Sequence, residues 1–162
     1  MGTKVVQLGD PLGVGQVRSR EVACLTAMGD FERCKELFPS LMSLLEPIGD
    51  AWEISAGRIY SGLALYYRGE LKKAREVGMT VLGDARRSKD PLHIASATSL
   101  CALAGFGYRD TSVVVPPAKD PMVLAFFCFA EALAELYAGR PEKAVALLHP
   151  LLSIPSMGFH TA

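Results

Sequence analysis

The sequence predicts an all-α fold in which antiparallel helix pairs stack side by side into a solenoid. Three segments carry this prediction. In each of them a glycine is followed five residues later by a small residue, with an apolar stretch before the glycine and an amphipathic stretch after it; they read AMGDFERCKELF, YYRGELKKAREV and YAGRPEKAVALL. A unit that recurs in this way is typical of helical repeats, in which each helix pair buries its apolar face against its neighbour.

Small residues at fixed places in these segments are expected to hold the two helices of each pair close together. Glycine is suited to the left-handed backbone at a helix end. A large side chain five residues after the glycine would separate two antiparallel helices at their closest approach, so a small residue is expected there. A glycine inside the first helix of the middle unit is expected to allow the same close approach. The residues assigned to repeat packing are Gly29, Cys34, Gly62, Gly69, Ala74, Gly139 and Ala144.

The elements can be placed in order along the chain. A flexible linker is expected over residues 1–13 and a tail over residues 155–162. The helical-repeat domain between them, residues 14–154, is predicted to contain seven helices, near residues 14–28, 31–45, 50–68, 71–88, 91–107, 121–138 and 141–152.

Local signals support several of these boundaries. Asp50, Asp90 and Asp120 are expected to be N-caps, and the last two are followed by a proline, which is favoured in the first turn of a helix. Residues 108–119 contain two adjacent prolines, which a helix interior does not tolerate. We expect a loop there in place of the second helix of the third unit, either as a functional insertion or as a degenerate linker.

These residues resemble the tetratricopeptide repeat family, whose pattern places small residues, a glycine, an aromatic residue and an alanine at set positions of a helix pair. The middle unit is similar to the pattern at Arg58, Ser61, Gly62, Leu65, Gly69, Leu71 and Ala74. The first unit is similar at Val22, Leu25, Gly29, Phe31, Cys34 and Phe38, and the last at Ala132, Gly139, Ala144 and Leu148. The resemblance implies a right-handed superhelix whose first helices line a concave groove.

One longer stretch, GLALYYRGELKKARE with ARRSKDPLHIA after it, is similar to the repeats of bacterial signal-transduction ATPases and maltose-activator-like transcription regulators. In those families such repeats form a sensor or partner-binding arm. The resemblance therefore implies a non-catalytic protein–protein interaction scaffold, the regulatory arm of a larger signalling or transcription-regulatory protein.

The resemblance also implies which side chains line the groove. In the first unit they are Gln16, Ser19, Ala23 and Thr26, and in the later units Ile59, Leu63, Tyr67, Phe126, Phe129 and Leu133. The apolar lining of the later units suits an amphipathic helix of a partner protein or, as an alternative function, a small hydrophobic ligand held by a sensor domain. A third interpretation is that a tight superhelix packs these side chains against each other.

Composition and motifs favour a cytoplasmic protein that has no catalytic site, cofactor or metal. Lys and Arg together number 17, as do Asp and Glu, so no excess of positive charge is expected for nucleic-acid binding. The first residues lack the apolar segment of a signal peptide, and the most apolar stretch, PMVLAFFCFA, is too short to span a membrane. No phosphate-binding loop, metal-ligand spacing or nucleophile motif is found.

The cysteines and histidines are expected to be structural. Each of Cys24, Cys34, Cys101 and Cys128 falls within an apolar helical segment, which favours a small, buried and reduced side chain. The histidines, His93, His149 and His160, lie on separate segments and are expected at the surface or at helix ends.

Two surface features could bind partners. A basic cluster at Lys72, Lys73, Arg75, Arg86 and Arg87 is interpreted as a solvated helix face, with an acidic partner as the alternative. Leucines at 147, 148, 151 and 152 leave an apolar edge at the last helix, where a solenoid normally has a polar cap. The hypothesis is that the chain comes from a longer protein or self-associates as a homodimer through this C-terminal helix.

Overall fold

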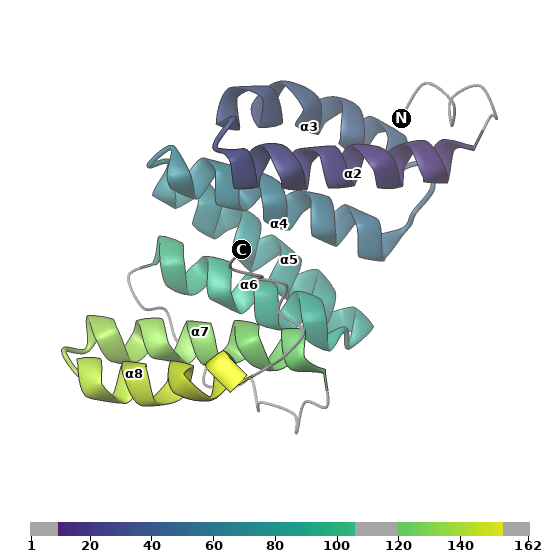
Figure 1. Cartoon of the computed structure of the whole chain (residues 1–162). Helices are drawn as coiled ribbons and strands as arrows, with labels where there is room; N and C mark the ends of the chain where they lie inside the picture. Colours follow the sequence, from purple (N-terminus) through teal and green to yellow (C-terminus); the bar gives the residue numbers. More distant parts are fainter. Residues whose placement is uncertain (1–9, 106–119, 154–162) are drawn as a thin grey trace.

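The computed structural model describes residues 10–105 and 120–153 of the chain. Within these ranges all regular structure is helical, which confirms the predicted all-α helical-repeat fold. The helices are α2 (Pro11–Met28), α3 (Phe31–Leu45), α4 (Ala51–Tyr67), α5 (Leu71–Ser88), α6 (Pro91–Ala104), α7 (Pro121–Tyr137), α8 (Pro141–Leu148) and the 3-10 helix η1 (His149–Ser153). Figure 1 shows them stacked from α2 and α3 at one end to α7 and α8 at the other.

Three aspartates cap helices as the sequence predicts. The Asp50 carboxylate accepts a hydrogen bond from the backbone N–H of Glu53 at 2.9 Å, at the start of α4. Asp90 accepts from two backbone N–H groups of α6, at 2.9 and 3.1 Å. Asp120 accepts from two N–H groups of α7, at 2.8 and 3.4 Å. Each side chain satisfies donors that have no partner within their own helix.

The N-terminal boundary differs from the prediction. α2 begins at Pro11, so residues 11–13 belong to the helix and not to a linker. Asp10 and Pro11 repeat the aspartate–proline pair that starts α6 and α7, a signal that the prediction did not use here. Gly15 lies inside α2, where an added Cβ would be 2.4 Å from Leu45 Cδ2, so glycine allows α2 to approach the end of α3.

The other boundaries are close to the prediction. α8 is shorter than expected, and the chain continues from Leu148 as a 3-10 helix to Ser153. The end predicted for the fifth helix at residue 107, the loop at 108–119 and the tail at 155–162 lie outside the described residues.

Small residues lie where the helices of each pair meet. Gly29, Gly69 and Gly139 follow the first helices with φ values of +79°, +80° and +73°, a left-handed backbone that L side chains rarely adopt. Five residues later, Cys34, Ala74 and Ala144 are 1%, 0% and 6% exposed. The thiol of Cys34 lies 3.3 Å from the hydroxyl of Thr26 on α2, so α2 and α3 are in direct contact at this position.

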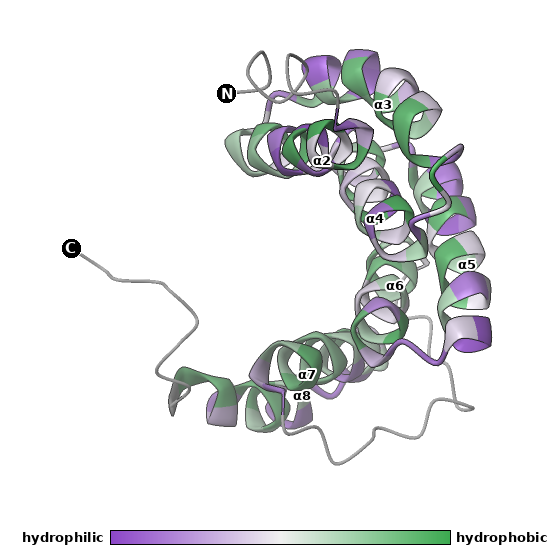
Figure 2. Cartoon of the chain, turned by 90° about the vertical axis from the view of Figure 1, so that its right-hand side faces the viewer, coloured by the Kyte–Doolittle hydropathy of each residue, from purple (hydrophilic) through white to green (hydrophobic). Residues whose placement is uncertain are grey.

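The helices form an arc with an inner and an outer layer. Figure 2 shows α2, α4 and α6 along the inner side and α3 and α5 along the outer side. α7 packs directly against α6, where the hydroxyl of Ser99 donates to the backbone carbonyl of Phe126 at 2.7 Å. α7 thus takes the place of the next inner helix, beside α6.

Three apolar clusters hold this arrangement together. The first joins α2, α3 and α4 around Val22 and Leu41, and the second joins α4, α5 and α6 around Val81 and Leu100. The third joins α6 and α7 around Phe127. In the described part of the chain, no helix is both long enough and apolar enough to cross a membrane.

Candidate partner-binding groove

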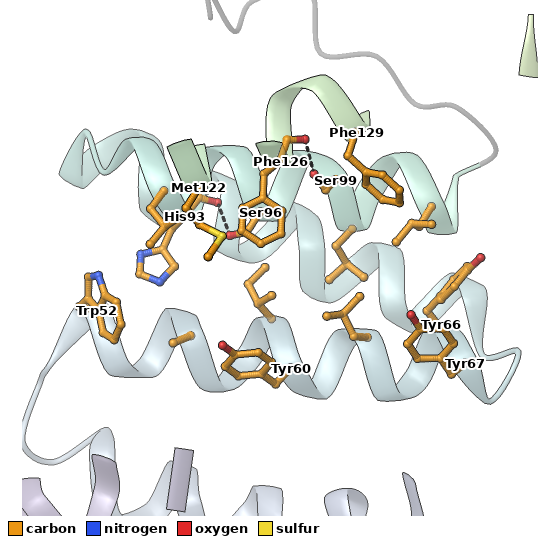
Figure 3. Close-up of a pocket in the computed structure, with 16 residues that line it drawn as sticks. Trp52, Tyr60, Tyr66, Tyr67, His93, Ser96, Ser99, Met122, Phe126 and Phe129 are labelled. Carbon is orange, nitrogen blue, oxygen red and sulfur yellow. Dashed lines mark hydrogen bonds between the residues drawn. The ribbon is translucent and has the colours of Figure 1, made fainter. Parts of the chain in front are cut away.

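Two adjoining hollows form a groove on the inner side of the arc. The first, the α4–α7 hollow, has a volume of about 390 Å³ and is lined by side chains of α4, α6 and α7 (Figure 3). The second, the α2–α4 hollow, has a volume of about 420 Å³ and lies between α2, α4 and the start of α3. The two share a wall of three α4 side chains: Tyr60, Leu63 and Tyr67.

Five of the six apolar residues predicted for the groove line the α4–α7 hollow; they are Ile59, Leu63, Tyr67, Phe126 and Phe129. Leu133 is not among its lining residues, although it is one helical turn beyond Phe129 on α7. The side chains do not close the groove by packing on each other, because Tyr67 is 58% exposed and Phe129 38% exposed.

Two of the four residues that the first unit was expected to contribute to the groove line it, and two do not. Ala23 and Thr26 line the α2–α4 hollow. Ser19, in contrast, is fully buried, and Gln16 is exposed without lining either hollow. The prediction was wrong for Ser19, because the face of α2 on which it lies packs into the protein.

An aromatic cluster marks one end of the groove. The rings of Phe31 and Tyr67 stack with their centroids 5.4 Å apart and an angle of 14° between planes. Tyr66 meets Tyr67 edge to face at 5.2 Å. Such pairs add to the free energy of area burial and hold each ring in one orientation. The half-exposed ring of Tyr67 is therefore a rigid apolar surface shared by both hollows.

A polar cluster around Trp52 marks the other end, and Figure 3 shows Trp52 and His93 of this cluster. The indole ring meets the imidazole of His93 edge to face, with centroids 5.3 Å apart. The guanidinium of Arg20 lies 5.3 Å from the centre of the indole ring, a cation–π distance. Arg20 also pairs with the buried carboxylate of Glu53, at 3.5 Å between nitrogen and oxygen. Three helices, α2, α4 and α6, are thus joined here.

His93 lies in the first turn of α6, at a helix end as predicted, but it is buried and not at the surface. Its side chain belongs to the wall of the α4–α7 hollow and is 5% exposed, with Nδ1 2.7 Å from Oδ2 of Asp90. Partial burial by itself raises the pKa of Asp90, but hydrogen bonds from the His93 ring and from the backbone N–H groups of Leu92 and His93 outweigh it and hold the pKa below its usual 3.8. An aspartate three residues before a histidine in a first helical turn is the signal that could have indicated this pair.

The serine hydroxyls in the hollow are used inside the protein. Ser99 donates to a backbone carbonyl of α7, as described above. Ser96 lies 3.4 Å from the carbonyl of His93. Their hydrogens are directed to backbone carbonyls, which leaves a groove surface dominated by aromatic and aliphatic groups.

The basic cluster on α5 is largely engaged with neighbouring groups. Lys73 pairs with Glu70 at 2.7 Å, and this hydrogen bond lowers the pKa of Glu70. Arg87 pairs with Asp84, and Arg75 and Arg86 also take part in interactions. Lys72 is exposed. These pairings favour a solvated helix face, and binding of an acidic partner stays a prediction.

Two cysteines are buried as predicted and two are not. Cys34 and Cys101 are buried, and burial raises the pKa of the Cys101 thiol to about 11. Cys128 is half-buried. Cys24 is exposed on α2, so the prediction that Cys24 is buried was wrong. Among the described residues, no group of three or more His, Cys, Asp or Glu side chains could hold a metal ion.

The C-terminal end of the stack exposes apolar side chains. Val145 on α8 is 64% exposed and Leu152 on η1 is 84% exposed, while Leu147, Leu148 and Leu151 are half-buried. The apolar edge expected from the sequence is present at these positions, and self-association through it stays a prediction.

Comparison of the chain with models of protein families, with curated proteins and with solved structures gives no match.

Proposed function

We propose that this protein is a tetratricopeptide-like interaction module that binds an amphipathic helix of a partner protein in its inner groove. The observation that carries the proposal is the wall of Tyr60, Leu63 and Tyr67 shared by two hollows. A helix lying over this wall can place one apolar anchor in the α4–α7 hollow and another in the α2–α4 hollow, whereas a compact ligand fills only one. Recognition of an amphipathic helix by an apolar groove is a recurring binding mode.

Partner binding of this kind suits the regulatory arm of a larger signalling or transcription-regulatory protein in the cytoplasm. The proposal assigns no catalytic role to the groove. The groups that could take part in chemistry, the imidazole of His93 and the serine hydroxyls, make structural hydrogen bonds to Asp90 and to backbone carbonyls.

The proposal is tested with a fluorescently labelled, designed helical peptide that carries leucines and one large aromatic residue along one face. Tyr67→Glu and Phe129→Glu place a charge on the exposed part of each hollow and are expected to abolish binding, because the charge must be desolvated under the apolar peptide face. Met79→Glu is the matched control, since Met79 is 42% exposed on the outer helix α5.

Circular dichroism is expected to show all three variants folded, since the replaced side chains are partly exposed. Unchanged peptide affinity in both groove variants would reject the groove as the binding site, and an equal loss in Met79→Glu would reject the distinction between inner and outer layers.

The size of the α4–α7 hollow favours a second candidate, a sensor for a small hydrophobic ligand. Its volume of about 390 Å³ lies in the range of small-molecule sites. A ligand that binds the folded state raises the melting temperature by mass action. A thermal-shift screen of small hydrophobic compounds therefore separates the two functions, since a partner-binding module is not expected to gain stability from them.

A further inference from the structure

We propose, on the basis of the groove function above, that the α4–α7 hollow selects a partner helix whose anchor residue is tryptophan, with the indole N–H donating to Nε2 of His93. An apolar groove alone does not determine the chemistry of the anchor residue. Three features of the α4–α7 hollow favour tryptophan: the tautomer of the His93 ring, the fixed position of that ring and the low polarity of the surrounding wall.

The pair with Asp90 determines which nitrogen of His93 can bind an occupant. An ionised carboxylate only accepts hydrogen bonds, so Nδ1 of His93 must carry the hydrogen in the 2.7 Å contact. In the neutral ring Nε2 then has no hydrogen and offers a lone pair. Because Nε2 is on the far side of the ring from Nδ1, this acceptor faces away from Asp90.

The ring is held in place from two sides. Asp90 is itself fixed, because it also accepts from the backbone N–H groups of Leu92 and His93 at the start of α6. On the other side, the indole of Trp52 meets the imidazole edge to face, and Figure 3 shows the ring between α6 and Trp52 at one end of the hollow. A preorganised acceptor loses little conformational entropy when a donor binds.

The rest of the wall makes this acceptor selective. The described lining is otherwise mostly aromatic and aliphatic, and Ser96 and Ser99 direct their hydrogens to backbone carbonyls. A purely apolar anchor would cover Nε2 and leave it without a donor, which is unfavourable. A lysine or arginine anchor would bring a charge into an apolar hollow at a larger cost.

Tryptophan both fits an apolar hollow and supplies a hydrogen-bond donor for Nε2 of His93. Its indole has a large apolar surface and one N–H group that only donates. Tyrosine has a smaller ring and a hydroxyl whose lone pairs would also need donors. Tryptophan is also enriched among the residues that dominate protein–protein binding free energies.

The test compares two labelled helical peptides that differ only at the anchor, one with tryptophan and one with 2-naphthylalanine, which has a similar shape and no N–H. Anisotropy titrations are made at mildly alkaline pH. The wild-type protein is expected to bind the tryptophan peptide about five-fold more tightly. The preference should vanish in His93→Phe, which has no acceptor, and persist in part in His93→Gln, which keeps one.

A second readout does not depend on variants of a buried residue. Nitrogen-15 spectra of the His93 imidazole are expected to show an Nε2 shift with the tryptophan peptide and a smaller one with the naphthylalanine peptide. Equal affinities of both peptides for the wild type, or a preference that survives in His93→Phe, would overturn the inference while leaving the groove function intact. Free indole that binds as tightly as the peptide would overturn the choice of a partner helix, and binding of neither peptide would overturn the proposed function itself.

Discussion

Gly62 on α4 faces Leu100 on α6 so closely that a Cβ at position 62 would lie 2.4 Å from Cδ2 of Leu100. It would also lie 3.1 Å from Cγ1 of Val77 on α5. Leu100 is 1% exposed and belongs to the wall of the α4–α7 hollow. The missing methyl group at position 62 therefore sets both the spacing of three helices and the shape of the groove wall.

Gly62→Ala is expected to lower the free energy of unfolding by about 1 kcal/mol, because overpacking of a buried contact costs about 1–3 kcal/mol while alanine gains about 1 kcal/mol in helix propensity. Urea denaturation measures the change. Gly83→Ala on α5 is the matched control, since its nearest neighbour would be Nη1 of Arg87 at 3.7 Å. The control is expected to be stabilising, and a stabilising Gly62→Ala would contradict the close contact.

Asp90 is expected to stabilise the fold as both a helix cap and the partner of His93. Asp90→Ala should cost about 1 kcal/mol at neutral pH, the usual loss for a cap. Asp10 provides the control, because it precedes α2 without a side-chain capping bond, so Asp10→Ala should change little. Equal effects of the two substitutions in thermal unfolding would argue against the capping role of Asp90.

The Asp90 contribution should depend on pH in a defined direction. Because its folded-state pKa is below 3.8, the ionised carboxylate stabilises the fold at pH values above the unfolded pKa. This contribution is lost as the pH falls below 3.8 through the folded value. The difference in the free energy of unfolding between wild type and Asp90→Ala should therefore shrink in this acidic range. A difference that grows as the pH falls would contradict the stabilising role of the ionised Asp90.

Arg20 is expected to matter more for stability than an arginine in an ordinary surface pair. Its removal leaves the carboxylate of Glu53, which is 3% exposed, without this cation, and we expect a loss of about 1–2 kcal/mol in Arg20→Ala. Arg18 pairs with Glu21 at the surface, and Arg18→Ala should cost below about 0.5 kcal/mol. Trp52 is the one tryptophan of the chain, so its fluorescence should shift in Arg20→Ala and not in Arg18→Ala.

The sequence predicted the features that depend on local signals. Helix starts at Asp50, Asp90 and Asp120 follow from capping chemistry, and the turns at Gly29 and Gly69 follow from the backbone freedom of glycine. The residues that carry the tetratricopeptide resemblance likewise implied most of the apolar residues that line the α4–α7 hollow. These signals lie within one or two helical turns of each other.

Features that depend on how helices approach one another were missed. The contact of His93 with Trp52 joins α4 and α6, and neither helix alone indicates it. Ser19 was assigned to the groove because its position on α2 matches the pattern, but the rotation of α2 buries it completely. Gly15 falls within the first predicted helix, but only its contact with the side chain of Leu45 on α3 shows why glycine is needed at that position.

The most direct test of the account is a map of amide chemical-shift changes when the designed amphipathic peptide is titrated into the nitrogen-15-labelled protein. The account predicts changes on both sides of the shared wall, at Ala27 of the α2–α4 hollow, at Leu63 and at Phe126 of the α4–α7 hollow. Changes confined to the outer helices α3 and α5, with these three amides unmoved at saturation, would contradict it.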